Sequence, residues 1–288
     1  MSQDRLEASL DIDRRSSLEI VRIIQEQDRL VADAVAREEE RISQAIDGIA
    51  ERLAGGGRLL YAGAGTSGRI AMLDAAELPP TFGVDPSLVR VLMAGGERAF
   101  LAAAEGAEDD EAAAVEAVNR NVSAGDAVVG IAASGTTPYT VAAVRRAKEL
   151  GAFTVGVTSA PGSPLAGDVD IAIVVQTGPE VILGSSRMKS GTAQKLILNT
   201  ISTGVMIRLG RVYSNLMIEM PVTNEKLRRR GVRMVELAAG VSPDAAEQAL
   251  REAAGDVKLA TVMAKRRVSA GEARRLLDGR TLREVLER

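Results

Sequence analysis

Residues 58–69, RLLYAGAGTSGR, set a short apolar run directly before a turn that is rich in glycine and hydroxyl side chains. The run has the length of a buried strand, and a helical pattern follows the turn. Free backbone N–H groups and the helix dipole make the N-terminus of such a helix favourable for an anion. Thr66 and Ser67 add hydroxyl donors that suit phosphate oxygens, and Gly65 belongs to the same turn. The stretch therefore predicts a strand, a phosphate-binding turn and a helix.

The same arrangement recurs at residues 127–138, AVVGIAASGTTP. An apolar run again precedes a turn, and the hydroxyl side chains here are those of Ser134, Thr136 and Thr137. One turn of this kind is a weak signal, but two in one domain indicate a phosphorylated small molecule as the ligand. Tight turns alone would explain the glycines but not the hydroxyl residues. Ordinary helix capping is an alternative role for the hydroxyls, and it is compatible with phosphate binding.

A dinucleotide site is another interpretation of the first turn, because Gly63, Gly65 and Gly68 fit the pattern G-x-G-x-x-G. Such a site needs an acidic residue about 20 positions further on, at the end of a second strand. The corresponding stretch is 78–83, LPPTFG, which predicts a helix break, and Glu97 comes too late. The second hydroxyl-rich turn has no role in dinucleotide binding. The pattern favours a phosphorylated sugar over a nicotinamide dinucleotide.

Apolar runs and helical patterns alternate through the middle of the chain. Continuous apolar strands that alternate with helices indicate a parallel sheet covered by helices on both faces. We therefore expect an α/β fold, a three-layer α-β-α sandwich in which both turns lie beyond the carboxyl ends of the strands, where ligands bind. Strands are expected near 58–62, 88–94, 127–132, 153–158 and 169–175, and helices near 67–77, 97–118, 138–150 and 189–209.

Further helices are expected on both sides of this domain. Ser16 and Glu19 form a capping box, and a second N-terminal helix is expected over 32–53. After Arg233 the chain becomes rich in Ala, Arg and Glu, and three short helices are expected there. Their start signals are at Ser242-Pro243, Ser269 and Thr281. The predicted organisation is N-terminal helices over 1–48, a ligand-binding domain with its following helix over 49–232, and a helical appendage over 233–288.

The composition limits both partners and chemistry. Aromatic residues make up 2% of the 288 residues and the formal net charge is −3, which argues against binding to nucleic acid or to a membrane. No apolar stretch is long enough to span a bilayer, and the first residues do not resemble a signal peptide, so we expect a cytoplasmic protein. Because the chain has no His and no Cys, a zinc site of nitrogen and sulfur ligands and a Ser-His or Cys-His nucleophile are excluded. We therefore expect any acid–base catalysis to use Glu, Asp, Lys or Tyr.

Two glutamates are candidates for that chemistry. Glu77 follows Ile70 and Leu73 at the spacing of one helix face, which predicts that it continues an apolar face. Glu108 belongs to the acidic run AEGAEDD at 104–110. Burial and crowding of like charge favour the protonated form of such carboxyls, as a general acid requires. The alternatives are a helix-end carboxylate and a solvated face, and the spacing alone favours these alternatives.

Six segments carry a family resemblance. They are GAGTSGR at 63–69, LDAAELPPTFG at 73–83, AEGAEDD at 104–110, IAASGTTPY at 131–139, GSSRMKSGTAQKLILN at 184–199 and TNEKL at 223–227. Together they resemble the N-acetylmuramic acid 6-phosphate etherases of bacteria, whose core is the sugar isomerase (SIS) phosphosugar-binding fold. The similarity covers nearly the whole chain, including the C-terminal helices. Two departures are Leu78, where the family commonly has Cys, and Thr136, where it commonly has Arg. We expect the loss of that Arg to weaken a phosphate or sugar contact at the second turn, although Thr136 keeps a hydroxyl donor.

The resemblance implies an etherase of the lyase class. It cleaves the lactyl ether at C3 of the sugar with water and gives N-acetylglucosamine 6-phosphate and D-lactate, in the catabolism and recycling of cell-wall amino sugars. It implies Glu77 as the acid that assists departure of lactate and Glu108 as the second acid/base, acting on the C2 proton. No metal and no redox cofactor are required. The implied phosphate contacts are Ser67, Ser134, Thr136 and Thr137, and the implied further pocket residues are Ser185, Ser186 and Lys189, for which a capped surface helix is the alternative.

The spacing along the first helix bears on assembly. About ten residues separate Ser67 from Glu77, which is roughly 15 Å at 1.5 Å per residue. A hexose spans only part of that distance between its 6-phosphate and C3. A second subunit could supply the missing carboxylate, and the resemblance also implies a homodimer with active sites at its interface.

Two other functions share this pocket. One is a non-catalytic sensor of sugar phosphates, similar to the glucokinase regulatory protein, and the other is a sugar-phosphate isomerase of the SIS class. The presence of both Glu77 and Glu108 favours catalysis over sensing. An isomerase would not explain why segments of the ether-cleaving family recur. No helix-turn-helix with a basic recognition surface is apparent, which disfavours a regulator that binds DNA.

Overall fold

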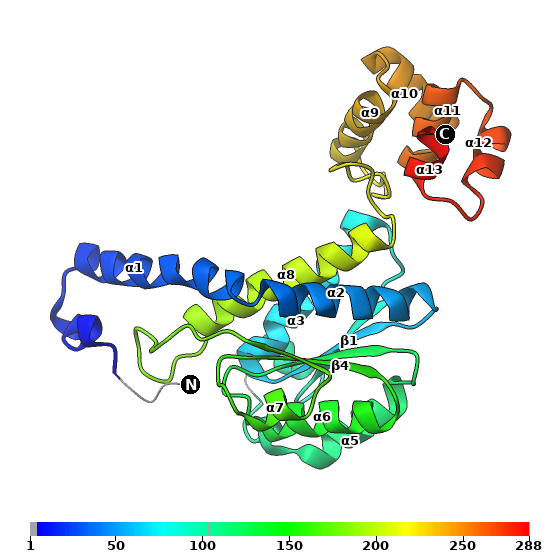
Figure 1. The fold of residues 1–288 in the computed structure, drawn as a ribbon. Coiled ribbons are helices and arrows are strands. Elements are labelled where there is room, and N and C mark those ends of the chain that lie inside the picture. Colours follow the sequence, from blue (N-terminus) through cyan, green and yellow to red (C-terminus); the bar gives the residue numbers. More distant parts are fainter. Residues whose placement is uncertain (1–4, 103, 288) are drawn as a thin grey trace. The chain divides into compact units, whose positions relative to one another are not determined.

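The computed structural model describes residues 5–102 and 104–287, which form two compact units (Figure 1). The first unit contains the chain up to Ala76 together with Ser87–Val205, and it holds the sheet. The second contains Glu77–Pro86 and the chain from Met206 onward, and it is helical. The predicted boundary at 232 falls inside a helix of the second unit, Glu225–Ala239.

A parallel five-stranded sheet in the order β2-β1-β3-β4-β5 forms the centre of the first unit. The inner strands β1 and β3 are buried along their whole length, which explains why their sequences are continuous apolar runs. The five predicted strands and the α/β class are confirmed. The strands are β1 (Leu59–Gly63), β2 (Val89–Met93), β3 (Ala127–Ile131), β4 (Phe153–Thr158) and β5 (Ile171–Val174).

Helices cover both faces of this sheet, so the three-layer sandwich is confirmed (Figure 1). On one face, Leu60 and Val128 of the strands pack against Val144 in a buried cluster. On the other face a helix packs so closely that a Cβ atom at Gly48 would lie 2.4 Å from the ring of Phe153. The first face carries α5 (Glu111–Asn121), α6 (Pro138–Glu149) and α7 (Pro164–Gly167), and the second carries α2 (Glu39–Ala54) and α8 (Lys189–Arg208).

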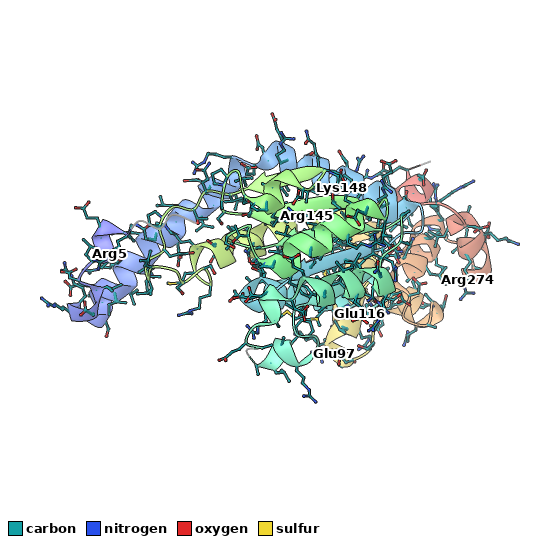
Figure 2. The ribbon with its side chains drawn as sticks, turned by 90° about the horizontal axis from the view of Figure 1, so that it is seen from below. Arg5, Glu97, Glu116, Arg145, Lys148 and Arg274 are labelled. Atoms are coloured by element: carbon teal, nitrogen blue, oxygen red, sulfur yellow. The ribbon has the colours of Figure 1, made fainter. Side chains whose placement is uncertain are left out.

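The outer surface of α5 and α6 is charged and solvated. Figure 2 labels Glu116, Arg145 and Lys148 on this surface. Their ion-pair partners are Arg120, Asp168 and Asp170, in that order. Exposed pairs of this kind contribute little to the stability of the fold.

The N-terminal helix is longer than predicted. The capping box of Ser16 and Glu19 is confirmed, but α1 (Ser17–Ala36) continues past residue 32 because Val31 and Ala34 are buried on its inner face. The turn to α2 comes at Glu38, whose Oε2 accepts a hydrogen bond from the backbone N–H of Val174 at 3.2 Å. The helix expected over 32–53 therefore begins later, at the point where the chain is tied to β5.

The helix predicted over 97–118 is wrong. The segment contains α4 (Arg98–Leu101), a 3₁₀ turn at Ala107–Asp109 and α5. Gly106 has φ of 74°, a left-handed conformation through which an α-helix cannot continue, and the Asp110 side chain caps α5 by accepting from the N–H of Ala113. As a result Glu108 lies on a short turn in front of a helix.

The helix that follows β1 also differs from its prediction. α3 (Gly65–Phe82) does not end before the two prolines but runs through Pro79 and Pro80. Its end is at Gly83, where φ is 62° and a Cβ atom would lie 2.2 Å from the carbonyl oxygen of Glu219. Buried Leu78 and Phe82 compensate for the backbone hydrogen bonds that the prolines cannot make.

The buried face of α3 is not the predicted one. Leu73 is 57% exposed and Glu77 is exposed, so the expectation that Glu77 continues a buried apolar face is wrong. The face turned toward the sheet instead carries Ala71, Asp74 and Ala75. Small side chains allow the helix to approach the sheet closely, which leaves the larger apolar residues outside.

The second unit has its own apolar core, formed by buried side chains such as Val235, Leu250 and Leu282. In the described chain four helices follow α9, not the predicted three, because Gly255 and Asp256 separate two of them. The predicted caps at Ser242, Ser269 and Thr281 are confirmed. The helices are α9 (Glu225–Ala239), α10 (Pro243–Glu252), α11 (Val257–Arg266), α12 (Ala270–Leu277) and α13 (Leu282–Leu286).

A buried carboxylate ties together the amino ends of β1 and β3. Oδ1 of Asp126 accepts from the backbone N–H of Arg58 at 2.8 Å, and Oδ2 accepts from the Arg58 guanidinium at 2.9 Å and the N–H of Ser123 at 2.8 Å. The Asp126 side chain is 2% exposed. Burial raises the pKa of this carboxyl, but the hydrogen bonds from Arg58 and Ser123 outweigh it and leave the pKa below its ordinary value.

Asp126→Asn should therefore destabilise the protein in a pH-dependent way. A depressed pKa in the folded state gives stability that is present above the unfolded-state pKa of about 3.9 and is lost as the pH falls through the folded-state value. We expect a loss of about 1–3 kcal/mol in the free energy of unfolding at pH 7. The difference from wild type should shrink between pH 5 and pH 3 in urea titrations. A difference that stays constant over that range would contradict this account.

Candidate functional site

The two glycine turns lie side by side at the carboxyl edge of the sheet. In the parallel pairing of β1 with β3, Gly63 is the register partner of Ile131, so the strands end together. α3 begins at Gly65, whose φ is 53°, directly after β1. Gly68 must lack a side chain here, because a Cβ atom would lie 2.2 Å from the Met93 sulfur. The sheet therefore brings both predicted phosphate-binding turns to one place.

The second turn is held in shape by its own side chains. The Ser134 hydroxyl accepts from the backbone N–H of Thr136 at 3.2 Å and from its hydroxyl at 3.0 Å. Gly135 has φ of 65°, and a Cβ atom there would lie 2.1 Å from Oγ of Ser163. Thr137 occupies the N-cap position of α6, but its side chain makes no capping hydrogen bond. Capping therefore does not account for the Thr137 hydroxyl.

A cavity of about 230 Å³ opens beside the first turn. Ala64 and Gly65 of that turn line one side of it, and the end of β2 lines another. The acidic segment at 104–108 completes the wall, with both Glu105 and Glu108. The structure thus brings predicted residues Gly65 and Glu108 to the same cavity, with Glu108 exposed on its 3₁₀ turn.

Two further residues of this wall were missed by the sequence analysis. Arg69 lines the cavity, and its guanidinium donates to the carbonyl oxygens of Phe100 at 3.2 Å and Ala102 at 3.0 Å. It therefore fastens the first turn of α3 to the segment that leads to Glu108. Glu105 is the other. The available signals were the position of Arg69 at the end of GAGTSGR and that of Glu105 three residues before Glu108.

The N-terminus of α8 adjoins the first turn. A Cβ atom at Gly191 would lie 3.7 Å from the Thr66 side chain and 3.5 Å from that of Ile70. Gly191 donates to the carbonyl oxygen of Ser186 at 2.9 Å, which keeps the partly buried Ser185–Ser186 pair at this end of the helix.

Lys189 takes a different place from the predicted one. It is 1% exposed, and its ammonium group donates to Oε1 of Gln27 on α1 at 2.9 Å. Burial lowers the pKa of Lys189, while the charges of Glu180 and Asp28 act in the opposite direction. The Glu180 carboxylate caps α8 by accepting from the N–H groups of Lys189 and Ser190, both at 2.9 Å. Lys189 is therefore neither a residue of an exposed helix nor part of the cavity lined by Glu108.

Glu77 lies further along α3, where the helix enters the second unit. Ten residues separate it from Ser67, which corresponds to roughly 15 Å along the helix axis. Its neighbours on the outer face, Met72 and Leu73, are exposed apolar side chains. Glu77 is thus exposed one turn after Leu73, and Ser67 stands near the start of that helix.

The groups around the cavity suit an anionic ligand with hydroxyl groups. The helix N-terminus and Arg69 favour negative charge, and the carboxylates accept hydrogen bonds or protons. Over residues 5–102 and 104–287, no three acidic side chains come together as a ligand set for a metal ion. No helix of the same described residues is both long and apolar enough to cross a membrane.

Comparison with solved structures agrees with the fold. A protein from Escherichia coli superposes with a TM-score of 0.52 at 17% identity, covering 70% of this chain and 97% of that one. A phosphoheptose isomerase from Francisella tularensis gives a TM-score of 0.52 at 20% identity, covering 67% of this chain and 100% of that one. At such identities the likeness concerns the fold alone.

Comparison of sequences is more specific. The SIS domain family matches residues 104–203, and the glucokinase regulatory protein N-terminal SIS domain family matches 41–148. The N-acetylmuramic acid 6-phosphate etherase of Symbiobacterium thermophilum is 57% identical, over 91% of this chain and 87% of the relative. Those of Clostridium beijerinckii and Escherichia coli K12 are 49% and 50% identical, over 96% and 98% of this chain and 91% and 95% of theirs. The chain belongs to the family of N-acetylmuramic acid 6-phosphate etherases and carries its SIS fold.

Proposed function

We propose that this protein cleaves the D-lactyl ether of N-acetylmuramic acid 6-phosphate with water, giving N-acetylglucosamine 6-phosphate and D-lactate. The observation that carries the proposal is the cavity in which a phosphate-binding turn and the Glu108 carboxylate meet, in a chain about half identical to named etherases along its length. A regulator of sugar-phosphate sensing is not favoured, because those relatives match nearly the whole chain. We also propose a cytoplasmic location, since a charged sugar phosphate does not cross a bilayer unaided.

The 6-phosphate binds at the carboxyl edge of the sheet in this proposal. The N-termini of α3 and α6 supply backbone N–H groups, and the hydroxyls of Ser67, Ser134 and Thr137 donate to the phosphate oxygens. Thr136 is exposed and bonded to Ser134, so it contributes to the shape of the turn as well as a neutral donor. Arg69 adds positive charge to the wall of the cavity. Ser185 and Ser186 extend the pocket at the start of α8.

Glu108 acts as the base at C2. In the open-chain sugar the aldehyde makes the C2 proton acidic, and the carboxylate removes it. The electron pair of the C2–H bond then forms the C2–C3 double bond while the C3–O bond to lactate breaks. Glu77 gives its proton to the departing ether oxygen, so that lactate leaves with a hydroxyl group.

Water completes the reaction on the unsaturated intermediate. Its oxygen bonds to C3, one of its protons restores the acid form of Glu77, and Glu108 returns a proton to C2. The two glutamates exchange only protons with the substrate and with water, so both return to their starting forms. The sugar and lactate products together have the composition of substrate plus water. Two carboxyl groups therefore suffice for these steps.

We further propose a homodimer whose active sites lie at the interface. Ser67 and Glu77 are too far apart along α3 for one hexose phosphate to reach both, so Glu77 would serve the site of the partner subunit. Met72 and Leu73 of α3 expose apolar side chains, and contact with a partner subunit would remove them from water. α1 also extends past the sheet in Figure 1 and exposes Leu18, Val21 and Leu30. In this proposal a second copy of the chain covers these apolar side chains.

The direct test of the activity is an incubation with N-acetylmuramic acid 6-phosphate in deuterated water. We expect D-lactate and N-acetylglucosamine 6-phosphate in equal amounts, with deuterium at C2 of the sugar because the base exchanges its proton with solvent. Enzymatic lactate assay and mass spectrometry give both quantities. If no lactate is released, the proposed function is wrong. If C2 of the sugar keeps its original proton in full, the elimination–addition route is wrong.

Substitution of Glu108 and substitution of Glu77 should affect different steps of the reaction. Glu108→Gln and Glu77→Gln should each lower lactate release by roughly 10²- to 10⁴-fold, the usual contribution of one general acid or base. Glu108→Gln should also abolish deuterium exchange at C2 of the substrate, whereas Glu77→Gln should retain it. Glu116→Gln, on the solvated face of α5 in Figure 2, is the matched control and should behave as wild type. Normal turnover in either variant would show that the substituted glutamate is not catalytic.

Subunit mixing tests the composite site. Inactive Glu77→Gln and Glu108→Gln proteins, mixed under conditions that allow exchange of subunits, should form heterodimers in which one of the two sites has both carboxylates. Equal mixing then restores roughly a quarter of wild-type activity, while each variant alone gains nothing. Analytical ultracentrifugation gives the dimer independently. An active monomer, or no recovery despite proven exchange, would contradict the proposal.

A further inference from the structure

A buried polar cluster joins β1, α3 and α8, and neither the proposed chemistry nor the phosphate site uses it. Asp74 on α3 is its centre. Oδ2 accepts from the hydroxyl of Tyr61 at 2.7 Å, and Oδ1 accepts from Nδ2 of Asn199 at 2.6 Å and from the hydroxyl of Ser202 at 2.9 Å. Tyr61 is fully buried, and Asp74 and Ser202 are nearly so.

A buried carboxylate is costly unless donors satisfy it, and here three neutral donors do so. Burial raises the pKa of Tyr61 well above its ordinary value, and Asp74 adds to this effect, so the phenol keeps its proton and remains a donor. Since the donors come from a central strand and from a second helix, they fix both the position of α3 and its rotation about its own axis.

The restraint matters because the next part of α3 lacks two helical hydrogen bonds and relies on the packing of Leu78 and Phe82 instead. Pro79 and Pro80 have no N–H, so the carbonyl groups of Ala75 and Ala76 lose their intrahelical partners. Glu77 sits between the two features, three residues after Asp74 and two before Pro79. The helical hydrogen bonds that determine where Glu77 points therefore depend on the turn that contains Asp74.

We propose that Asp74, held by Tyr61, Asn199 and Ser202, is a positioning residue that sets the direction in which α3 presents Glu77. The proposal rests on the role of Glu77 as the acid that assists lactate departure. An apolar residue would bury equally well at position 74, but it could not accept hydrogen bonds from a strand and a helix at once. The carboxylate thus gives orientation rather than extra stability.

The proposed reaction steps predict which measured quantities change when Glu77 is misdirected. A misdirected acid slows the breaking of the C3–O bond, which needs a proton on the leaving oxygen. Removal of the C2 proton by Glu108 does not need that acid. Lactate release should therefore fall while exchange at C2 continues, and substrate binding through the phosphate should change little.

Tyr61→Phe and Ser202→Ala each remove one donor and leave the packing nearly intact. The matched control is Thr154→Val, because the Thr154 hydroxyl is also buried and donates to a carboxylate, that of Asp170, at 2.8 Å at the far end of the sheet. In deuterated water we expect lactate release to fall roughly 10- to 100-fold in the two variants, as for a misplaced catalytic group. KM and C2 exchange should stay near wild type, and Thr154→Val should keep all three quantities.

Two outcomes would overturn the inference: undiminished lactate release in Tyr61→Phe, or equal losses of release and C2 exchange. Amide hydrogen exchange adds a readout that does not depend on the activity. Exchange in residues 75–82 should be faster in Tyr61→Phe than in Thr154→Val, and no difference would reject the positioning role even if wild type released no lactate. Absence of lactate release by wild type, with faster exchange in Tyr61→Phe, would instead reject only the proposed function.

Discussion

The parallel pairing of β1 with β3 is the constraint on which the candidate site depends. It places Gly63 opposite Ile131, so that two strands end at one level and two helices start from the same edge. Each helix N-terminus alone is a modest anion site, but two that converge can hold a doubly charged phosphate. The glycines at these turns are required by geometry: Gly135 and Gly65 have positive φ, and Gly68 and Gly135 leave no room for a Cβ atom.

The carboxyl edge of the sheet does not by itself determine a reaction, because proteins with the same fold include isomerases. The candidate acid–base residues of this chain lie on segments attached to that edge. The turn at 107–109 carries Glu108 to the cavity beside the first helix N-terminus, and Arg69 fastens the preceding segment to α3. Glu77 stands on the same helix that begins at the phosphate turn. A single helix thus connects the anion site, the buried Asp74 cluster and the second carboxylate.

The sequence predicted the sheet well because β1 and β3 are continuous apolar runs between turn residues, as their burial along the whole length requires. The helix predictions were wrong where another feature of the structure outweighed the local sequence signal. The alanine-rich stretch at 97–118 has helical periodicity, but Gly106 adopts a left-handed conformation and Asp110 caps a new helix. Two consecutive prolines predict a helix end, yet buried Leu78 and Phe82 keep α3 helical beyond them. Local backbone conformation and capping explain the first case, and tertiary packing explains the second.

The candidate site was predictable only in part. The two turns and Glu108 follow from motifs and from the resemblance, but the adjacency of the turns depends on strand order and register, and the meeting of the first turn with Glu108 in one cavity depends on the fold of residues 98–110. Lys189 was expected at the pocket, and its contact with Gln27 needs the path of α1 to be known. Asp74 was invisible to the sequence analysis, because its donors come from residues 13, 125 and 128 positions away.

A crystal structure with bound N-acetylglucosamine 6-phosphate is the measurement that tests this account most directly. The phosphate oxygens should lie within hydrogen-bond distance, about 2.7–3.2 Å, of the Ser67 and Ser134 hydroxyls and of backbone N–H groups in both turns. The sugar should extend toward the acidic segment with C2 beside the Glu108 carboxylate. A phosphate bound away from both turns, or a sugar ring directed away from Glu108, would contradict the account.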